Sequence, residues 1–69
     1  MFIVEIQNRN THASMGFLTE EEWRGKFGFC LTNLQYEAYR FKSFNHANTV
    51  AQDFVGDSTS RMIVIKEVD

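Results

Sequence analysis

The sequence predicts an α+β domain built on a small antiparallel sheet, and three observations lead to this prediction. Two segments near the ends of the chain, MFIVEIQ and RMIVIKEV, have the apolar composition of strands. Between them, residues 45–55 change to the spacing of an amphipathic helix. The chain has 69 residues, of which 43% are hydrophobic. This size fits a single domain over residues 1–69 with no deep, enclosed cleft.

The chain opens with a strand and a polar loop. Phe2, Val4 and Ile6 share one face of the strand at period two. The following segment, NRNTHAS (residues 8–14), has no apolar period and is rich in residues that hydrogen-bond to nearby backbone. We therefore expect a surface loop there.

A helix-start signal follows at Thr19. In a capping box the Thr19 hydroxyl accepts from the amide of Glu22, and the Glu22 carboxylate reaches back to Thr19. Leu18 and Trp23 hold the positions of a hydrophobic staple, and three successive glutamates suit the first turn of a helix. These signals predict a short helix over about residues 20–27, with Gly28 at its end.

Two more strands are predicted after this helix, joined as a hairpin. Phe27, Phe29 and Leu31 alternate with smaller or polar residues, which predicts a strand that ends at residues 32–33 and has its phenylalanines in the core. The segment YEAYRFKSF (residues 36–44) predicts the next strand, and the connection between the two is short enough for a hairpin.

The last two elements have the clearest patterns. One apolar stripe predicts a helix over residues 46–55, with Asn45 as N-cap and Gly56 after the C-terminus; the stripe consists of Ala47, Val50, Ala51, Phe54 and Val55. Residues 61–68 predict a final strand that is apolar on both faces over residues 62–65, as in the middle of a sheet.

The predicted order is strand, helix, strand, strand, helix, strand. It matches the split β-α-β, or ferredoxin-like, plan, in which the first and last strands are central. Because the first helix is short and follows a long loop, a simplified variant with one helix packed across a sheet face is the alternative.

Charge and cysteine content exclude several classes of function. The net charge of -2 is too small for a polybasic nucleic-acid binder or a strongly acidic DNA mimic. Cys30 is the single cysteine, so no disulfide within the chain is expected and a reducing cytoplasm is the expected compartment. The N-terminal segment resembles neither a signal peptide nor a membrane span. We expect no cofactor, no metal site and no membrane partner.

Two patterns, a run of glutamates and a pair of histidines, consist of residue types used in catalysis, but neither predicts a catalytic site. Adjacent carboxylates in a run such as Glu20, Glu21 and Glu22 diverge around a helix, so capping explains the run better than metal binding does. His12 and His46 are the residue type needed for a general acid and base, so a small two-histidine nuclease is one alternative. Nothing in their spacing places them together, and we predict no catalytic residue.

The most informative feature is an excess of aromatic residues: seven Phe, two Tyr and one Trp. So many rings exceed what a small core easily holds, so some are expected on the surface. On the predicted third strand, one face carries Tyr36, Arg40, Lys42 and Phe44, a mixture typical of protein interfaces. Additional contacts are expected from Arg9, His12 and Trp23.

The same basic and aromatic mixture also suits RNA or single-stranded DNA, so nucleic-acid binding is a second alternative. Self-association through the exposed aromatic residues is compatible with every one of these functions, because it adds buried area to a thin core.

Residues 39–68 also carry a resemblance. The strand YRFKSF, the helix NHANTVAQDFVG and the strand RMIVIKEV, in so short a chain, resemble small bacteriophage-encoded proteins that block bacterial machinery, such as anti-CRISPR proteins and the phage inhibitor of bacterial RNA polymerase. The resemblance implies a role, namely steric binding to a host protein or complex in the host cytoplasm without catalysis. It implies no individual functional residue.

Overall fold

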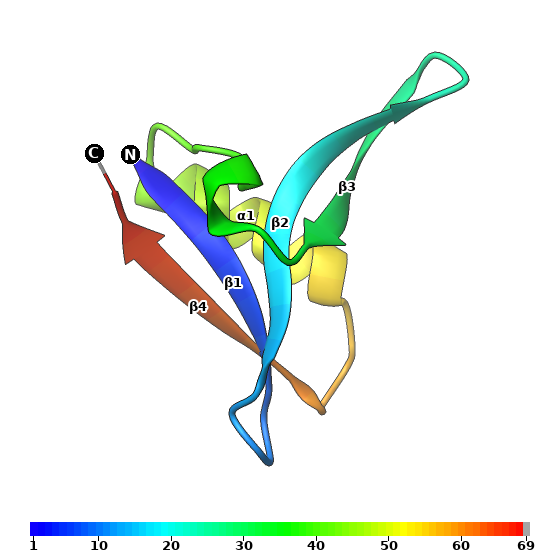
Figure 1. Ribbon diagram of the computed structural model, residues 1–69. Helices are drawn as coiled ribbons and strands as arrows, with labels where there is room; N and C mark the ends of the chain where they lie inside the picture. Colours follow the sequence, from blue (N-terminus) through cyan, green and yellow to red (C-terminus); the bar gives the residue numbers. More distant parts are fainter. Residues whose placement is uncertain (69) are drawn as a thin grey trace.

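The computed structural model describes residues 1–68, and for Trp23 it describes the backbone only. Within these residues it contains four strands, one α-helix and one 3-10 turn: β1 (Phe2–Asn8), β2 (Ser14–Trp23), β3 (Lys26–Thr32), η1 (Gln35–Glu37), α1 (Phe44–Val55) and β4 (Arg61–Glu67). The strands form one antiparallel sheet in the order β3-β2-β1-β4 (Figure 1). The α+β prediction is confirmed in its simplified form, and the ferredoxin-like order is not found.

β1 is central, as predicted, and Ile3, Val4 and Ile6 on its two faces are almost fully buried. The prediction that the last strand is also central is wrong, because β4 pairs with β1 only and lies at the sheet edge. The meander β1-β2-β3 occupies one side of β1, so β4 can join only on the other side. Ile63 and Ile65, on one of its faces, pack against the core on the α1 side of the sheet.

The predicted helix over residues 20–27 is wrong. Residues 14–23 form β2, whose last part pairs with β3 in a hairpin that runs from Phe17 opposite Thr32 to Trp23 opposite Lys26. A two-residue turn at Arg24 and Gly25, with φ of 52° and 78°, closes this hairpin, and these positive φ values are typical of a type I′ turn. The Thr19 hydroxyl donates to the Glu37 carbonyl instead of capping a helix.

The polar segment NRNTHAS forms a loop, as predicted, but it joins β1 to a strand and not to a helix, and Asn8 and Ser14 at its ends already belong to β1 and β2. The Asn8 side chain accepts from the amides of Asn10 and Thr11, and His12 has a φ of 61°. After the turn, the pairing register shifts between Ile6 and Gln7. Gly16 lies at this bulge with a φ of +125°, and a Cβ there would come within 2.9 Å of the Thr32 carbonyl oxygen.

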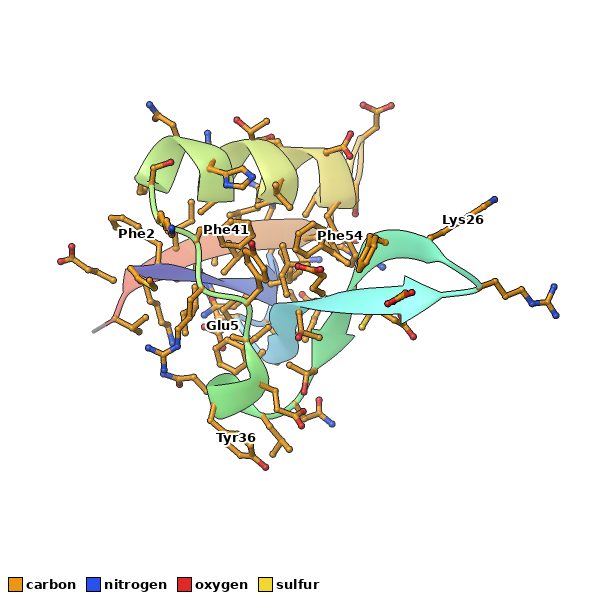
Figure 2. The ribbon with its side chains drawn as sticks, turned by 90° about the horizontal axis from the view of Figure 1, so that it is seen from above. Phe2, Glu5, Lys26, Tyr36, Phe41 and Phe54 are labelled. Carbon is orange, nitrogen blue, oxygen red and sulfur yellow. The ribbon has the colours of Figure 1, made fainter. Side chains whose placement is uncertain are left out.

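Residues 36–44 do not form the predicted strand. β1 and β2 pair only over Glu5–Gln7 and diverge toward the start of β1 (Figure 1). The chain passes through the resulting gap: the Tyr39 amide donates to the Leu18 carbonyl, and Phe41 exchanges two backbone hydrogen bonds with Phe2 at 2.7 and 2.8 Å. Seen from above, η1 and α1 therefore lie on opposite faces of the sheet (Figure 2).

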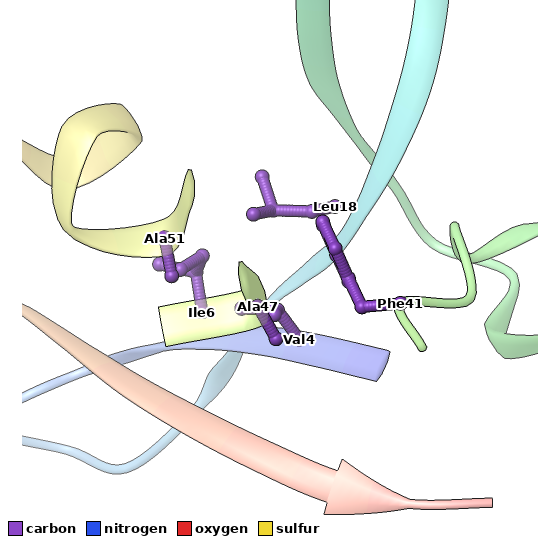
Figure 3. Packing of buried hydrophobic residues seen from close by; sticks show 6 residues of the cluster. All are labelled: Val4, Ile6, Leu18, Phe41, Ala47 and Ala51. Atoms are coloured by element: carbon purple, nitrogen blue, oxygen red, sulfur yellow. The ribbon is translucent and has the colours of Figure 1, made fainter. Parts of the chain in front are cut away.

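α1 confirms the predicted amphipathic helix and Gly56 at its end, but it begins two residues earlier than predicted. Ser43 is the N-cap in place of Asn45, and its hydroxyl accepts from the His46 amide at 3.1 Å. The helix buries its stripe against the sheet, where the main core consists of Val4, Ile6, Leu18, Phe41, Ala47 and Ala51 (Figure 3).

The opposite face of the sheet has a smaller core of Ile3, Phe17 and Ala38, and Glu5 lies buried beside it. The Glu5 carboxylate accepts from Gln7 at 2.9 Å and pairs with the Lys66 ammonium at 3.1 Å. Hydrogen bonding from Ser14, and then from Gln7 and Lys66, holds the pKa of Glu5 below 4.5 although desolvation acts against this. The group is therefore ionised and partnered in the folded protein.

Candidate functional site

The four residues predicted to share one strand face are divided between the two faces of the sheet. Tyr36 lies in η1 and is 76% exposed, whereas Phe44 begins α1 on the other side and is 53% exposed. Lys42 is exposed in the segment between them. The exposure of Tyr36 and Phe44 agrees with the prediction, but the common surface does not exist, because residues 38–43 cross the sheet.

Tyr36 and Arg40 do come together. They line a hollow of about 430 Å³ on the η1 side, together with Ile3, Asn33, Leu34, Gln35 and Val68. Leu34 is 43% exposed there. We call this surface the Tyr36 hollow. Phe44 instead packs edge-on against Phe2, with ring centroids 6.0 Å apart.

Arg9 and His12 lie at the other end of β1, in the β1–β2 turn. The Arg9 guanidinium donates to the carbonyl of Arg61 at 3.3 Å. They therefore contribute to neither the Tyr36 hollow nor the surface around Phe44. The Trp23 side chain lies outside the part of the chain that the structure describes, so its predicted role stays a prediction.

The two histidines are not brought together. His46 packs edge-on against Phe41, at the start of β1, with ring centroids 5.2 Å apart, and Phe41 is bonded there to Phe2. His12 follows the end of β1. Seven strand residues separate the two places by roughly 20 Å, so the pair does not form the acid and base of a nuclease.

Cys30 has no features of an activated nucleophile. Burial raises the pKa of its thiol, and the neighbouring Glu21 raises it further. Within residues 1–68, no group of three or more His, Cys, Asp and Glu side chains is placed to hold a metal ion.

A second hollow, larger than the Tyr36 hollow, lies between the β2–β3 hairpin and α1. It measures about 610 Å³ and is lined by Glu20, Phe27, Gly28, Phe29, Thr49, Val50, Asp53 and Phe54. We call it the hairpin groove. Phe27 lines it and is 71% exposed, whereas Phe29 is partly buried and stacks on Phe41 with ring centroids 5.9 Å apart. The prediction that Phe27 belongs to the core is therefore wrong.

The groove forms where the β2–β3 hairpin extends past α1 (Figure 1). α1 has 12 residues and is about 18 Å long, whereas the ten residues of β2 span about 33 Å. The hairpin therefore projects from the body of the domain, with Lys26 near its tip (Figures 1 and 2). Phe29 still meets the core, but Phe27, two residues nearer the tip on the same strand face, lies beyond it.

The rim of the groove is acidic. Glu20 and Glu22 lie opposite Phe29 and Phe27 in the strand pairing, so their side chains share the strand face that turns toward α1. Asp53 lines the groove from the helix side. Lys26 pairs with Trp23, one position out of phase with Phe27, and lies on the opposite strand face. The groove thus combines an aromatic floor with three carboxylates.

Sequence reasoning pointed to the Tyr36 hollow in part and missed the hairpin groove. The missed signal was a two-residue turn, Arg24-Gly25, followed two residues later by the aromatic residue Phe27. Such a position lies at the tip of a long hairpin, where no second layer covers it.

Comparison with known proteins gives no relative for this chain. No protein-family model matches it, and neither a curated protein nor a solved structure shows significant similarity. Among residues 1–68 no helix has the length and apolar character needed to cross a membrane.

Proposed function

We propose that this protein is a non-catalytic binding protein that acts by covering a surface of a partner protein. The observation that carries the proposal is Phe27, a large ring that is 71% exposed at the mouth of a groove lined by Phe29, Val50 and Phe54. Exposed aromatic residues beside preformed hollows are typical anchors of protein interfaces. The hairpin groove is the principal contact.

The chemistry of the groove defines the partner. An apolar floor accepts an aliphatic or aromatic side chain, and the carboxylates of Glu20, Glu22 and Asp53 favour Lys or Arg beside that side chain. The expected ligand is therefore a protein segment with an apolar anchor flanked by basic residues. The acidic rim repels a nucleic-acid backbone, so the geometry favours a protein over RNA or single-stranded DNA.

The Tyr36 hollow is a second contact of this binding protein. Tyr36 and Leu34 are both exposed there, on the sheet face away from α1. The two surfaces face in different directions, so they suit two patches of one large complex. This is the steric role in the host cytoplasm that the resemblance to phage-encoded inhibitors implies.

The test is affinity capture from a bacterial lysate with matched variants. We expect the wild-type protein to recover one discrete partner in the presence of nuclease. We expect Phe27→Ser to lose that partner, and the charge change Glu20→Lys with Asp53→Lys to weaken its binding. His12→Ser, at the far end of β1, is the matched surface control and should bind as wild type does.

Two results would refute the proposal. Equal recovery by wild type and Phe27→Ser would exclude the groove as the contact. Loss of every captured protein after nuclease treatment, together with direct binding to single-stranded nucleic acid that falls steeply with salt, would support the nucleic-acid alternative instead.

A further inference from the structure

The outer edge of β4 is a further surface, distinct from the hairpin groove and the Tyr36 hollow, that can bind a partner. β4 has seven residues, RMIVIKE, without proline, and β1 lies on its inner side (Figure 1). Among residues 1–68, no strand pairs with its outer side. A long apolar edge of this kind is a template for another strand, and natural proteins usually block such edges.

The hydrogen bonds at the two ends of the β1–β4 ladder determine which residues face outward. Met1 and Val68 exchange two bonds, at 2.7 and 2.8 Å, and at the other end the Arg9 amide donates to Ser60. Because inward and outward residues alternate in an antiparallel ladder, the even-numbered residues of β4 face β1. The odd-numbered ones present free edges; they are Arg61, Ile63, Ile65 and Glu67.

The bond that the Arg61 carbonyl accepts from the Arg9 guanidinium agrees with this assignment, because it comes from outside the ladder. A carbonyl oxygen has two lone pairs, so this bond leaves room for a second donor. The backbone groups of Ile63, Ile65 and Glu67 are the main part of the open edge.

We infer that this edge pairs with the β4 strand of a second copy of the chain, antiparallel, about a two-fold axis at Val64. In that register Ile63 lies opposite Ile65 of the second copy, and Arg61 lies opposite Glu67 at both ends. Outward backbone groups then meet outward groups throughout. Two apolar pairs and two pairs of opposite charge result, all of which stabilise a strand pair.

The other sheet edge does not offer this match. β3, with the sequence KFGFCLT, has Gly28 in its interior, and self-pairing about its centre places Lys26 opposite the uncharged Thr32. Pairing through β4 also keeps the two helices on one face of a continuous sheet, since a two-fold axis of this kind is perpendicular to the sheet. It leaves the hairpin groove, at the opposite sheet edge, accessible on both copies. The inference is therefore independent of the proposed function.

Charge reversal at the two ends of β4 tests the register. In sedimentation velocity over a concentration series, we expect wild type to change from monomer to dimer. Arg61→Glu and Glu67→Arg each place like charges opposite one another twice, so each should weaken dimerisation roughly ten-fold. The double variant, Arg61→Glu with Glu67→Arg, restores opposite charges and should dimerise as wild type does.

The wild-type protein offers a second measurement that does not depend on any variant folding. Amide hydrogen exchange at Ile63, Ile65 and Glu67 should slow as concentration rises, whereas the inward amides of Met62, Val64 and Lys66 should be protected at every concentration. A monomer at all concentrations overturns the inference. A dimer that is insensitive to both single reversals and is lost in Phe27→Ser also overturns it, because it places the contact at the exposed aromatic residues.

Discussion

Replacing Phe41 by alanine tests the most unusual feature of the fold, the passage of the chain between β1 and β2. The Phe41 ring is 1% exposed and contacts Phe29, Tyr39 and His46 with centroid distances of 5.9, 4.7 and 5.2 Å. Truncation of a fully buried aromatic ring costs about 3–5 kcal/mol. A chain of this length is stable by roughly 3–10 kcal/mol, so Phe41→Ala should remove about a third of the free energy of unfolding or more.

Urea denaturation followed by circular dichroism measures this loss, with Phe44→Ala as the control. Phe44 is three residues away and makes one edge contact with Phe2, but it is 53% exposed, so its truncation should cost about 1 kcal/mol or less. With a slope near 1 kcal/mol per molar urea, the two midpoints should differ by about 2 M or more. If Phe41→Ala and Phe44→Ala unfolded at similar urea concentrations, the crossing segment would not be packed as described.

Three further outcomes follow from particular residues. Gly16→Ala should lower the free energy of unfolding by about 2 kcal/mol in the same urea assay, because φ is +125° and the new Cβ would meet the Thr32 carbonyl. Arg24→Asn should raise it by about 0.5 kcal/mol, since asparagine suits the positive φ of 52° better than arginine does. The pKa of Glu5 is lower in the folded than in the unfolded protein, so ionised Glu5 contributes fully to the free energy of unfolding above its unfolded pKa, about 4.5. This contribution is lost as pH falls through the folded-state pKa. Glu5→Gln should therefore reduce the fall of the urea midpoint with decreasing pH.

The sequence predicted the correct type for β1, β3, α1 and β4, because the apolar period of each segment matches the structure that it forms. Ala47, Ala51 and Phe54 recur at the spacing of a helix. Val4 and Ile6 recur at the two-residue spacing of a strand. Gly56 ends the helix as predicted. In these segments local propensity and tertiary packing favour the same structure.

The capping-box signal at Thr19 and Glu22 failed because tertiary pairing outweighed it. An isolated helix of about eight residues, with a glycine inside it, is only marginally stable. As a strand, the same segment gains a complete ladder of partners from Phe17 to Trp23 along β3. The Arg24-Gly25 turn makes that ladder possible, and arginine followed by glycine is not among the dipeptides that commonly indicate such a turn.

The segment 36–44 shows a different limit. Its alternating aromatic residues are typical of a strand, and Tyr39 and Phe41 do pack toward the main core. Yet the segment forms no continuous ladder: Phe41 bridges to Phe2 of β1 and the Tyr39 amide donates to Leu18 of β2, because the segment crosses between two faces of the sheet. The alternation of apolar residues in this segment indicates that alternate side chains are buried. It does not indicate that Tyr36 and Phe44, at the two ends of the segment, lie on opposite faces of the sheet. For this reason the four residues predicted to form one surface do not do so.

The divergence of β1 and β2 explains both surfaces on which the proposals depend. Because the two strands separate, residues 38–41 fill the gap, and the chain reaches the face where α1 packs. α1 then lies over the middle of the sheet and ends before the hairpin tip, which leaves Phe27 uncovered. From α1 the chain returns to the free side of β1, so its last strand forms an edge. An aromatic groove and an apolar edge thus arise from one departure from a regular sheet, at opposite sides of the molecule, where each can engage a different partner.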